Sequence, residues 1–191
     1  MSHNKMSAKA IELLAGGLRD NTRLTDFFFT HNNLAEHLEA SKTLLATFAN
    51  KKDLRSLAFN SCNLDNVLLL SMQNAIEDHT KLKELYLFAN KIDKEGAQYI
   101  SKIIQNKNFL TCLGLSNNRL DAAGAVEIAK YGLKDKTSIV KLSIENNGIG
   151  NEGLKEISIA LAKCTKIEEL YLYNNEIDDD PIKDFTALLR N

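Results

Sequence analysis

The residue types that most often carry out catalysis are few in this chain. Its four histidines, His3, His31, His37 and His79, are scattered, and no set of cysteines and histidines has the spacing of a zinc site. Cys112 could act as a nucleophile only beside a general base, and no histidine is expected near it. The chain also lacks the glycine-rich sequences that bind phosphate groups. We therefore expect a protein that is not an enzyme and that uses no metal or cofactor.

The element that must position any functional side chain is an eleven-residue frame that occurs six times. Residues 82–92, LKELYLFANKI, show it best, with apolar residues at places one, four, six and eleven and asparagine at place nine. The other copies start at residues 24, 54, 110, 139 and 167, and all six are apolar at these four places. The starts are 28 to 30 residues apart. A period this regular indicates stacked repeats that share one hydrophobic core.

The frame matches the L-x-x-L-x-L-x-x-N/C-x-L signature of leucine-rich repeats. Because its units are long, the chain resembles the ribonuclease-inhibitor type of that family, over about residues 6–191. The resemblance implies an α/β leucine-rich-repeat solenoid, a short horseshoe with six parallel strands on its concave face and helices on its convex face. We expect one domain, residues 1–191. Residues 1–23 would form a half-repeat whose helix, capped by Ser7, covers the end of the core.

Places three to seven of each frame should form a short strand that sends places four and six into the core and the odd places outward. Helices cover only the convex side, so the concave face is the natural binding surface. Its candidate binding residues are Phe28, Glu84, Tyr86, Phe88, Lys141, Glu145, Glu169, Tyr171 and Tyr173. Exposed aromatic residues beside acids are typical anchors of protein interfaces. The small side chains of Cys112, Gly114 and Ser116 should leave a groove between the aromatic clusters. The alternative is that the aromatic side chains only pack together along the sheet.

The asparagines at place nine have a structural interpretation. They are Asn32, Asn90, Asn118, Asn147 and Asn175, and Cys62 takes this place in the second repeat. Stacking hides the backbone groups of the turn from water, and an amide side chain can satisfy both donors and acceptors. We therefore predict a structural asparagine ladder rather than a binding site.

Composition and charge limit the choice of partner and compartment. The net charge is −1, with 24 basic and 25 acidic residues that look well mixed, which argues against nucleic acid. The sequence contains no run of eighteen apolar residues that would span a membrane, and its start lacks the pattern of a signal peptide. Three cysteines in unrelated places indicate free thiols in a reducing, cytoplasmic compartment.

Two functions remain open. In the first, the concave face binds another protein with a basic surface, and the resemblance implies that this partner is an enzyme whose active site is covered. In the second, the chain regulates an enzyme from its rim loops, as the Ran GTPase activators of the same repeat type do, with Arg119 and Asn117 as candidates.

Two further expectations concern association and origin. The last strand has an open edge, which predicts weak self-association. The composition, rich in lysine, asparagine and isoleucine, also resembles that of leucine-rich-repeat effectors that intracellular bacteria deliver into the host cytosol.

Overall fold

The computed structural model describes residues 4–182, 185 and 186 of the chain. Helices and strands alternate along it. The helices are α1 (Ala8–Arg19), α2 (Leu38–Ala46), α3 (Asn66–Ile76), α4 (Lys94–Gln105), α5 (Asp121–Glu127) and α6 (Gly150–Leu161). The strands are β1 (Asp26–Phe28), β2 (Ser56–Ala58), β3 (Glu84–Tyr86), β4 (Cys112–Gly114), β5 (Lys141–Ser143) and β6 (Glu169–Tyr171). Two 3₁₀ turns, η1 (Ala35–His37) and η2 (Thr47–Asn50), flank α2, and a π-helix, η3 (Ile128–Leu133), continues α5.

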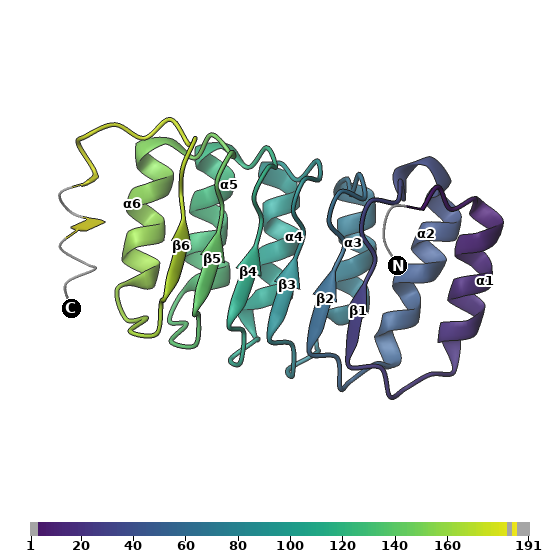
Figure 1. Cartoon of the computed structure of the whole chain (residues 1–191). Helices are drawn as coiled ribbons and strands as arrows, with labels where there is room; N and C mark the ends of the chain where they lie inside the picture. The colour runs from purple at the N-terminus through teal and green to yellow at the C-terminus, as the bar shows by residue number, and fades with distance from the viewer. Residues whose placement is uncertain (1–3, 183–184, 187–191) are drawn as a thin grey trace.

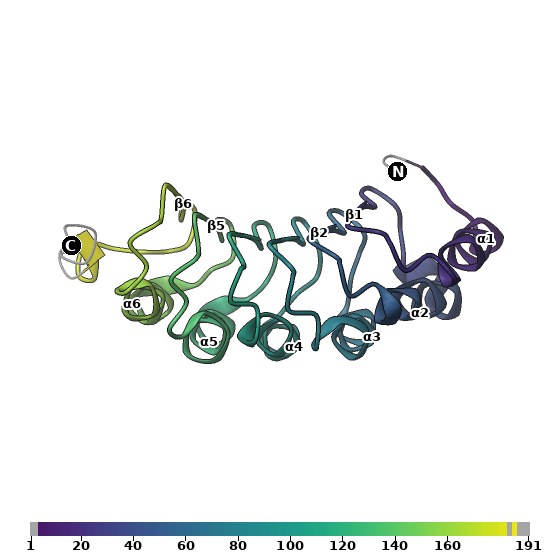
Figure 2. The ribbon, with the colours of Figure 1, turned by 90° about the horizontal axis from the view of Figure 1, so that it is seen from below.

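The six strands form one parallel sheet in the order of the chain. Figure 2 shows the helices along one side of a shallow arc and the strands along the other. In Figure 1 the sheet faces the viewer and the helices lie behind it. The α/β solenoid that the repeats predict is therefore confirmed, with its strands on the concave face and its helices on the convex face.

The strands are shorter than predicted. Each occupies only places three to five of its frame, although hydrogen bonds to the next repeat continue beyond it, from Leu87 N to Gly114 O at 2.8 Å and from Ala89 N to Ser116 O at 2.9 Å. The chain then turns sharply at place eight, where the backbone has a positive φ between 52° and 56° in all six repeats. Asparagine, which tolerates this left-handed conformation better than most residues, stands there in three of them.

The core follows the apolar places of the frame. Leu82, Leu85, Leu87 and Ile92 of one repeat are fully buried, and α4 adds Ile100, Ile103 and Ile104 from the convex side. Burial of each such side chain contributes about 1.5–3 kcal/mol. In the first two repeats phenylalanines fill this space instead. They are Phe27, Phe29, Phe48 and Phe59, and the centroids of their contacting rings lie 5.0–6.0 Å apart.

The N-terminal end of the core is covered by α1. Ser7 caps this helix as predicted, since its Oγ accepts a hydrogen bond from Ala10 N at 3.3 Å. Ile11 and Ala15 are the buried residues of its inner face. At the other end, the sequence predicts a final helix with Phe185, Leu188 and Leu189, and most of it lies outside the described residues.

The repeat that starts at residue 110 is one residue longer than its neighbours, and the π-helix η3 lies in it. Glycine at position 132 allows η3 to approach α4 closely, because a Cβ atom there would lie 2.7 Å from Ile104 Cδ1. The wider turn leaves Tyr131 on the convex surface with 62% of its area exposed. Residues 129–131 of this π-helix line a groove on the convex face.

Candidate protein-binding face

The nine candidate residues differ in exposure. Phe28, Tyr171 and Tyr173 are 48%, 37% and 58% exposed, and Glu169 is also exposed. The other five candidates are half-buried: Glu84, Tyr86, Phe88, Lys141 and Glu145. The structure brings them together as one group on β3 and a second group on β5 and β6 with the turns that follow, whereas Phe28 lies on β1, two strands from Tyr86.

The two aromatic side chains of the group on β3, Tyr86 and Phe88, have turned toward β4. The Tyr86 and Phe88 ring centroids are 5.7 Å apart. The Phe88 ring lies over Gly114, so that a Cβ atom on this glycine would be 2.3 Å from Phe88 Cζ. The predicted groove over β4 is therefore wrong, because an aromatic ring fills the space that the small residues leave. Burial, followed by a hydrogen bond to Cys112, raises the pKa of the Tyr86 hydroxyl.

The group on β5 and β6 is held together by polar contacts. Lys141 Nζ donates to Glu169 Oε2 at 2.5 Å and lies 5.0 Å from the centroid of the Tyr171 ring. The Tyr171 hydroxyl donates to the same carboxylate oxygen at 2.9 Å, and the Tyr173 hydroxyl donates to Glu145 Oε1 at 3.3 Å. The hydrogen bond from Lys141 lowers the pKa of Glu169. The two tyrosines are thus oriented by fixed partners.

The concave strands carry more acids than bases. Asp26, Glu84 and Glu169 stand at place three, Glu145 at place seven, and Lys141 is the only basic residue at an odd place of the six frames. Glu84 Oε2 accepts a hydrogen bond from Ser56 Oγ at 2.8 Å. Lys141 forms an ion pair with Glu169, so the carboxylates of Asp26, Glu84 and Glu145 have no basic residue at an odd place of a frame to balance them. They give this face a negative charge.

The place-nine asparagines connect successive repeats. Asn118 Nδ2 donates to Leu87 O at 3.0 Å, Leu115 O at 2.8 Å and Ser116 O at 3.3 Å. Its Oδ1 accepts from Asn90 N at 3.1 Å and Ile92 N at 3.2 Å. Each asparagine of the ladder is buried. In the second repeat Cys62 Sγ replaces only the donor part, with a contact of 3.0 Å to Phe29 O.

A second buried ladder escaped the sequence reasoning. Lys51, His79, Lys107 and Lys136 each stand three residues before a frame, and all are buried. Each binds a carbonyl near the end of the helix or 3₁₀ turn of the preceding repeat: Leu18 O for Lys51 at 2.9 Å, Phe48 O for His79 at 2.9 Å, Glu77 O for Lys107, and Gln105 O for Lys136 at 2.6 Å. At Glu77 O and Gln105 O they supply the acceptor with a donor at the helix end, whereas Leu18 O and Phe48 O also accept from the backbone N–H groups of Asn21 and Lys51.

Burial is the main influence on the protonation of this ladder. It lowers the pKa of all four side chains, and that of Lys107 falls to about 8. A signal for these residues was present in the sequence, as a polar residue that recurs at one fixed place. It was overlooked because a charged side chain is normally assigned to the surface.

Cys62, Cys112 and Cys164 are free thiols, as predicted. Cys62 is buried, and burial raises its pKa to about 11. No group of three or more potential metal ligands occurs among the described residues. Within the same residues, no helix has the length and apolar character needed to cross a membrane.

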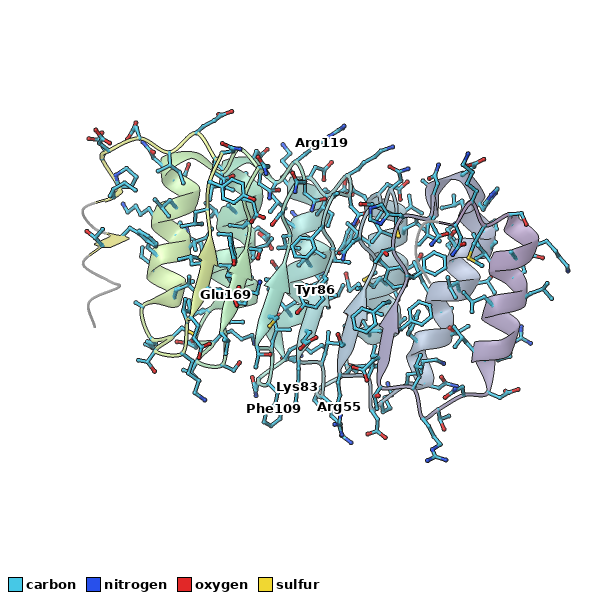
Figure 3. The ribbon with its side chains drawn as sticks, viewed as in Figure 1. Arg55, Lys83, Tyr86, Phe109, Arg119 and Glu169 are labelled. Carbon is cyan, nitrogen blue, oxygen red and sulfur yellow. The ribbon has the colours of Figure 1, made fainter. Side chains whose placement is uncertain are left out.

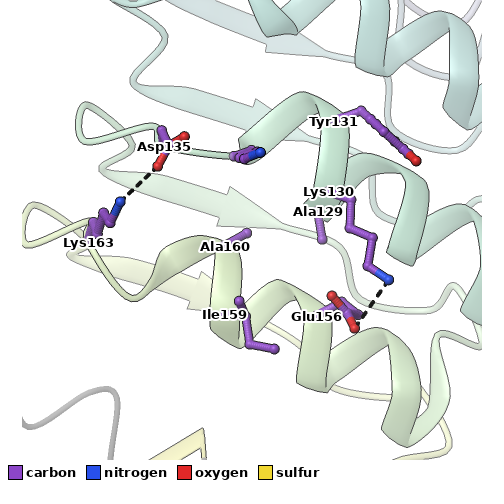
Figure 4. Close-up of a pocket in the computed structure, with 9 residues that line it drawn as sticks. Ala129, Lys130, Tyr131, Asp135, Glu156, Ile159, Ala160 and Lys163 are labelled. Carbon is purple, nitrogen blue, oxygen red and sulfur yellow. Dashed lines mark hydrogen bonds and ion pairs between the residues drawn. The ribbon is translucent and has the colours of Figure 1, made fainter.

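The convex face has a groove between η3 and α6, with a volume of about 450 Å³ (Figure 4). Its floor is apolar, with Ala129 and Ala160, and Tyr131 and Ile159 stand on opposite walls. Lys130 and Glu156 form an ion pair across it at 3.4 Å. The candidate residues of the concave face take no part in this groove.

Comparisons with known proteins agree with this architecture. The family model described as "Leucine Rich repeat" matches residues 78–101, 106–129 and 135–158. Ribonuclease inhibitor from Mus musculus is 22% identical over 190 residues, covering 99% of this chain and 41% of the inhibitor. The protein phosphatase 1 regulatory subunit 37 homolog from Caenorhabditis briggsae is 26% identical over 145 residues, covering 73% of this chain.

The chain therefore spans less than half of the length of these relatives, and only 16% of the phosphatase subunit homolog. Among solved structures, the leiomodin-1 actin-binding site 2 is similar in fold, with a TM-score of 0.58 at 22% identity, covering 82% of this chain and 87% of that chain. The six repeats, the parallel sheet and these similarities together identify the chain as a leucine-rich-repeat protein of the ribonuclease-inhibitor type.

Proposed function

We propose that this protein is a non-catalytic module that binds a partner protein on its concave face. The observation that carries the proposal is the pair Tyr171 and Tyr173, which are exposed on the open side of the sheet beside carboxylates. Large exposed aromatic side chains with a polar tip are the usual energetic centres of protein interfaces. A repeat scaffold presents such residues along an extended concave surface.

The tyrosines are also prepared for binding. Glu169 and Lys141 hold Tyr171, and Glu145 holds Tyr173. Side chains that are already ordered lose less conformational entropy when a partner arrives, so more of the contact energy contributes to affinity. The excess of carboxylates on this face favours a partner with a basic surface, because complementary charge increases the rate of association.

The relatives support an enzyme as the partner. The names of two of them, a ribonuclease inhibitor and a phosphatase regulatory subunit homolog, describe proteins that act on enzymes. We extend this role to the present chain, in which a partner enzyme would be inhibited when the concave face covers its active site. The alternative is activation from the strand-end loops, where Arg119 is exposed (Figure 3).

Affinity capture tests the proposal. Wild-type protein would be compared with a Tyr171→Ala/Tyr173→Ala variant as bait, and Tyr131→Ala serves as the control because it removes a tyrosine that is at least as exposed, from the convex face. We expect a partner that is retained by the wild type and by Tyr131→Ala and lost with the concave variant. Equal retention by all three baits would refute concave binding. The activity of a captured enzyme should fall on binding, whereas a rise would favour the alternative.

A further inference from the structure

The charges that look well mixed along the sequence are separated in space. The segments between each helix and the next strand lie at one edge of the sheet, which we name the strand-start rim. They are residues 20–25, 51–55, 77–83, 106–111, 134–140 and 162–168. They contain eleven lysines and arginines but six acids, a net charge of +5. The segments that follow the strands, at the opposite rim, are residues 29–34, 59–65, 87–93, 115–120, 144–149 and 172–182. They contain two basic residues and seven acids, a net charge of −5.

Some cations of the strand-start rim already have structural partners. Three of its lysines belong to the buried ladder, and Lys81 and Lys163 form ion pairs with Asp53 and Asp135. Arg55 and Lys83 are exposed, and no carboxylate of the described residues lies within ion-pair distance of either. These two side chains can therefore bind an external anion without first breaking an internal contact.

Two of the six rim cations that are outside the buried ladder and have no ion pair among the described residues, Arg55 and Lys83, are next to an exposed aromatic residue. Lys83 N donates to Arg55 O at 2.8 Å, and Thr111 N donates to Lys83 O at 2.7 Å, so three successive repeats bring Arg55, Lys83 and the segment of Phe109 together. Figure 3 shows these three side chains at the same edge, opposite Arg119. Phe109 is 62% exposed, and it is the one large hydrophobic residue among the described residues of this rim that is so exposed.

We propose that Arg55, Lys83 and Phe109 form a second interaction surface, which binds an acidic protein segment with an apolar side chain. The acids of the rim favour a protein over a uniform polyanion. Asp53, which is paired with Lys81, also feels the charge of Arg55, so acidic and basic groups are interspersed here. A protein segment can place carboxylates against Arg55 and Lys83 and uncharged groups beside Asp53, whereas nucleic acid or an anionic membrane presents negative charge throughout. One exposed phenylalanine is also a small anchor for a membrane, since binding there increases with the buried apolar area.

Fluorescence anisotropy with a labelled acidic peptide tests this proposal. The probe is a peptide of about twelve glutamates with two leucines at its centre, and a second probe replaces the leucines by glutamate. Arg55→Glu/Lys83→Glu should weaken binding of both probes by at least about tenfold. The control Lys91→Glu/Lys94→Glu makes the same change of net charge at the other edge of the sheet, at Lys91 of the opposite rim and at Lys94, the first residue of α4, and should weaken binding less than about threefold. Phe109→Ser should affect only the peptide that contains leucine.

The possible outcomes separate the proposal from its alternatives. If the two charge-reversal variants lost affinity for the peptide equally, only net charge would matter and the proposal would be overturned. The absence of peptide binding at about 50 mM salt would also overturn the proposal. Tighter binding of single-stranded RNA or of anionic phospholipid vesicles than of the peptide would overturn the choice of a protein partner. The surface is independent of the concave site, so Tyr171→Ala/Tyr173→Ala should bind the peptide normally.

Discussion

Replacement of Asn118 by alanine should destabilise the protein through two specific backbone groups. The carbonyls that receive hydrogen bonds from Asn118 each keep another donor: Asn90 Nδ2 for Leu87 O, Asn147 Nδ2 for Leu115 O, and Ala89 N for Ser116 O. The Oδ1 atom is different. It is the one acceptor seen for Asn90 N and for Ile92 N among the described residues, and both contacts are buried.

The magnitude follows from these two donors. A buried polar group left without a partner costs about 1–3 kcal/mol, so the loss of the acceptor for two backbone N–H groups should lower the free energy of unfolding by about 2–6 kcal/mol. Asn118→Cys separates the donor and acceptor roles. A thiol can donate to the carbonyls, as Cys62 does, but it does not replace the amide oxygen. We therefore expect Asn118→Cys to cost nearly as much as Asn118→Ala.

Urea denaturation followed by far-ultraviolet circular dichroism would measure these differences. Asn117→Ala is the neighbouring control. Asn117 is exposed, but its φ of 56° is unfavourable for alanine, so we expect a cost of about 1 kcal/mol. Ala89 occupies the same place in the preceding repeat, which shows that alanine can adopt this conformation. If Asn118→Cys had the same urea midpoint as the wild type, the loss of the amide oxygen would cost little. The stabilisation would then come from the hydrogen bonds to the carbonyls, and our explanation would be refuted.

Three further predictions concern thiols, pH and association. Freshly folded monomer should contain three free thiols by mass analysis, and the buried Cys62 should react with a thiol reagent more slowly than the half-buried Cys112; a disulfide between them would contradict the stacking. The folded pKa of Lys107, about 8, is below its unfolded value, so the unfolded state binds more protons above pH 8 and the free energy of unfolding should rise by about 1 kcal/mol from pH 8 to 9. In Lys107→Met this rise should be smaller, and an unchanged slope would exclude Lys107 as its source. The open edge of β6 should give weak self-association in sedimentation experiments, and a strict monomer at high concentration would exclude it.

The repeat frame predicts the backbone well for a physical reason. Leu85 and Leu87 can both reach the core only if the strand has one register, and the spacing of 28 to 30 residues fits only a stacked helix and strand. The frame also identifies Asn118 as a buried turn residue. The frame therefore predicts features within one repeat and features that recur in every repeat.

Side-chain directions on the concave face do not follow from the frame. Register assigns Phe88 to the open side, yet its ring lies over Gly114, because a neighbouring repeat without a side chain offers apolar contact. The same reasoning could not find the separation of charge between the two rims. It exists only after six segments from distant parts of the sequence, such as those of Arg55 and Lys83, are placed side by side.

The most direct test of concave binding combines partner affinity and stability on the same variants. Tyr173→Ala should weaken binding of the captured partner by at least about 2 kcal/mol, the scale of an interface hot spot. Its thermal melting should stay close to wild type, because Tyr173 is 58% exposed. Tyr131→Ala should alter neither quantity. Unchanged affinity in Tyr173→Ala would contradict the concave site, and a large loss of thermal stability would show that this tyrosine belongs to the packed structure instead.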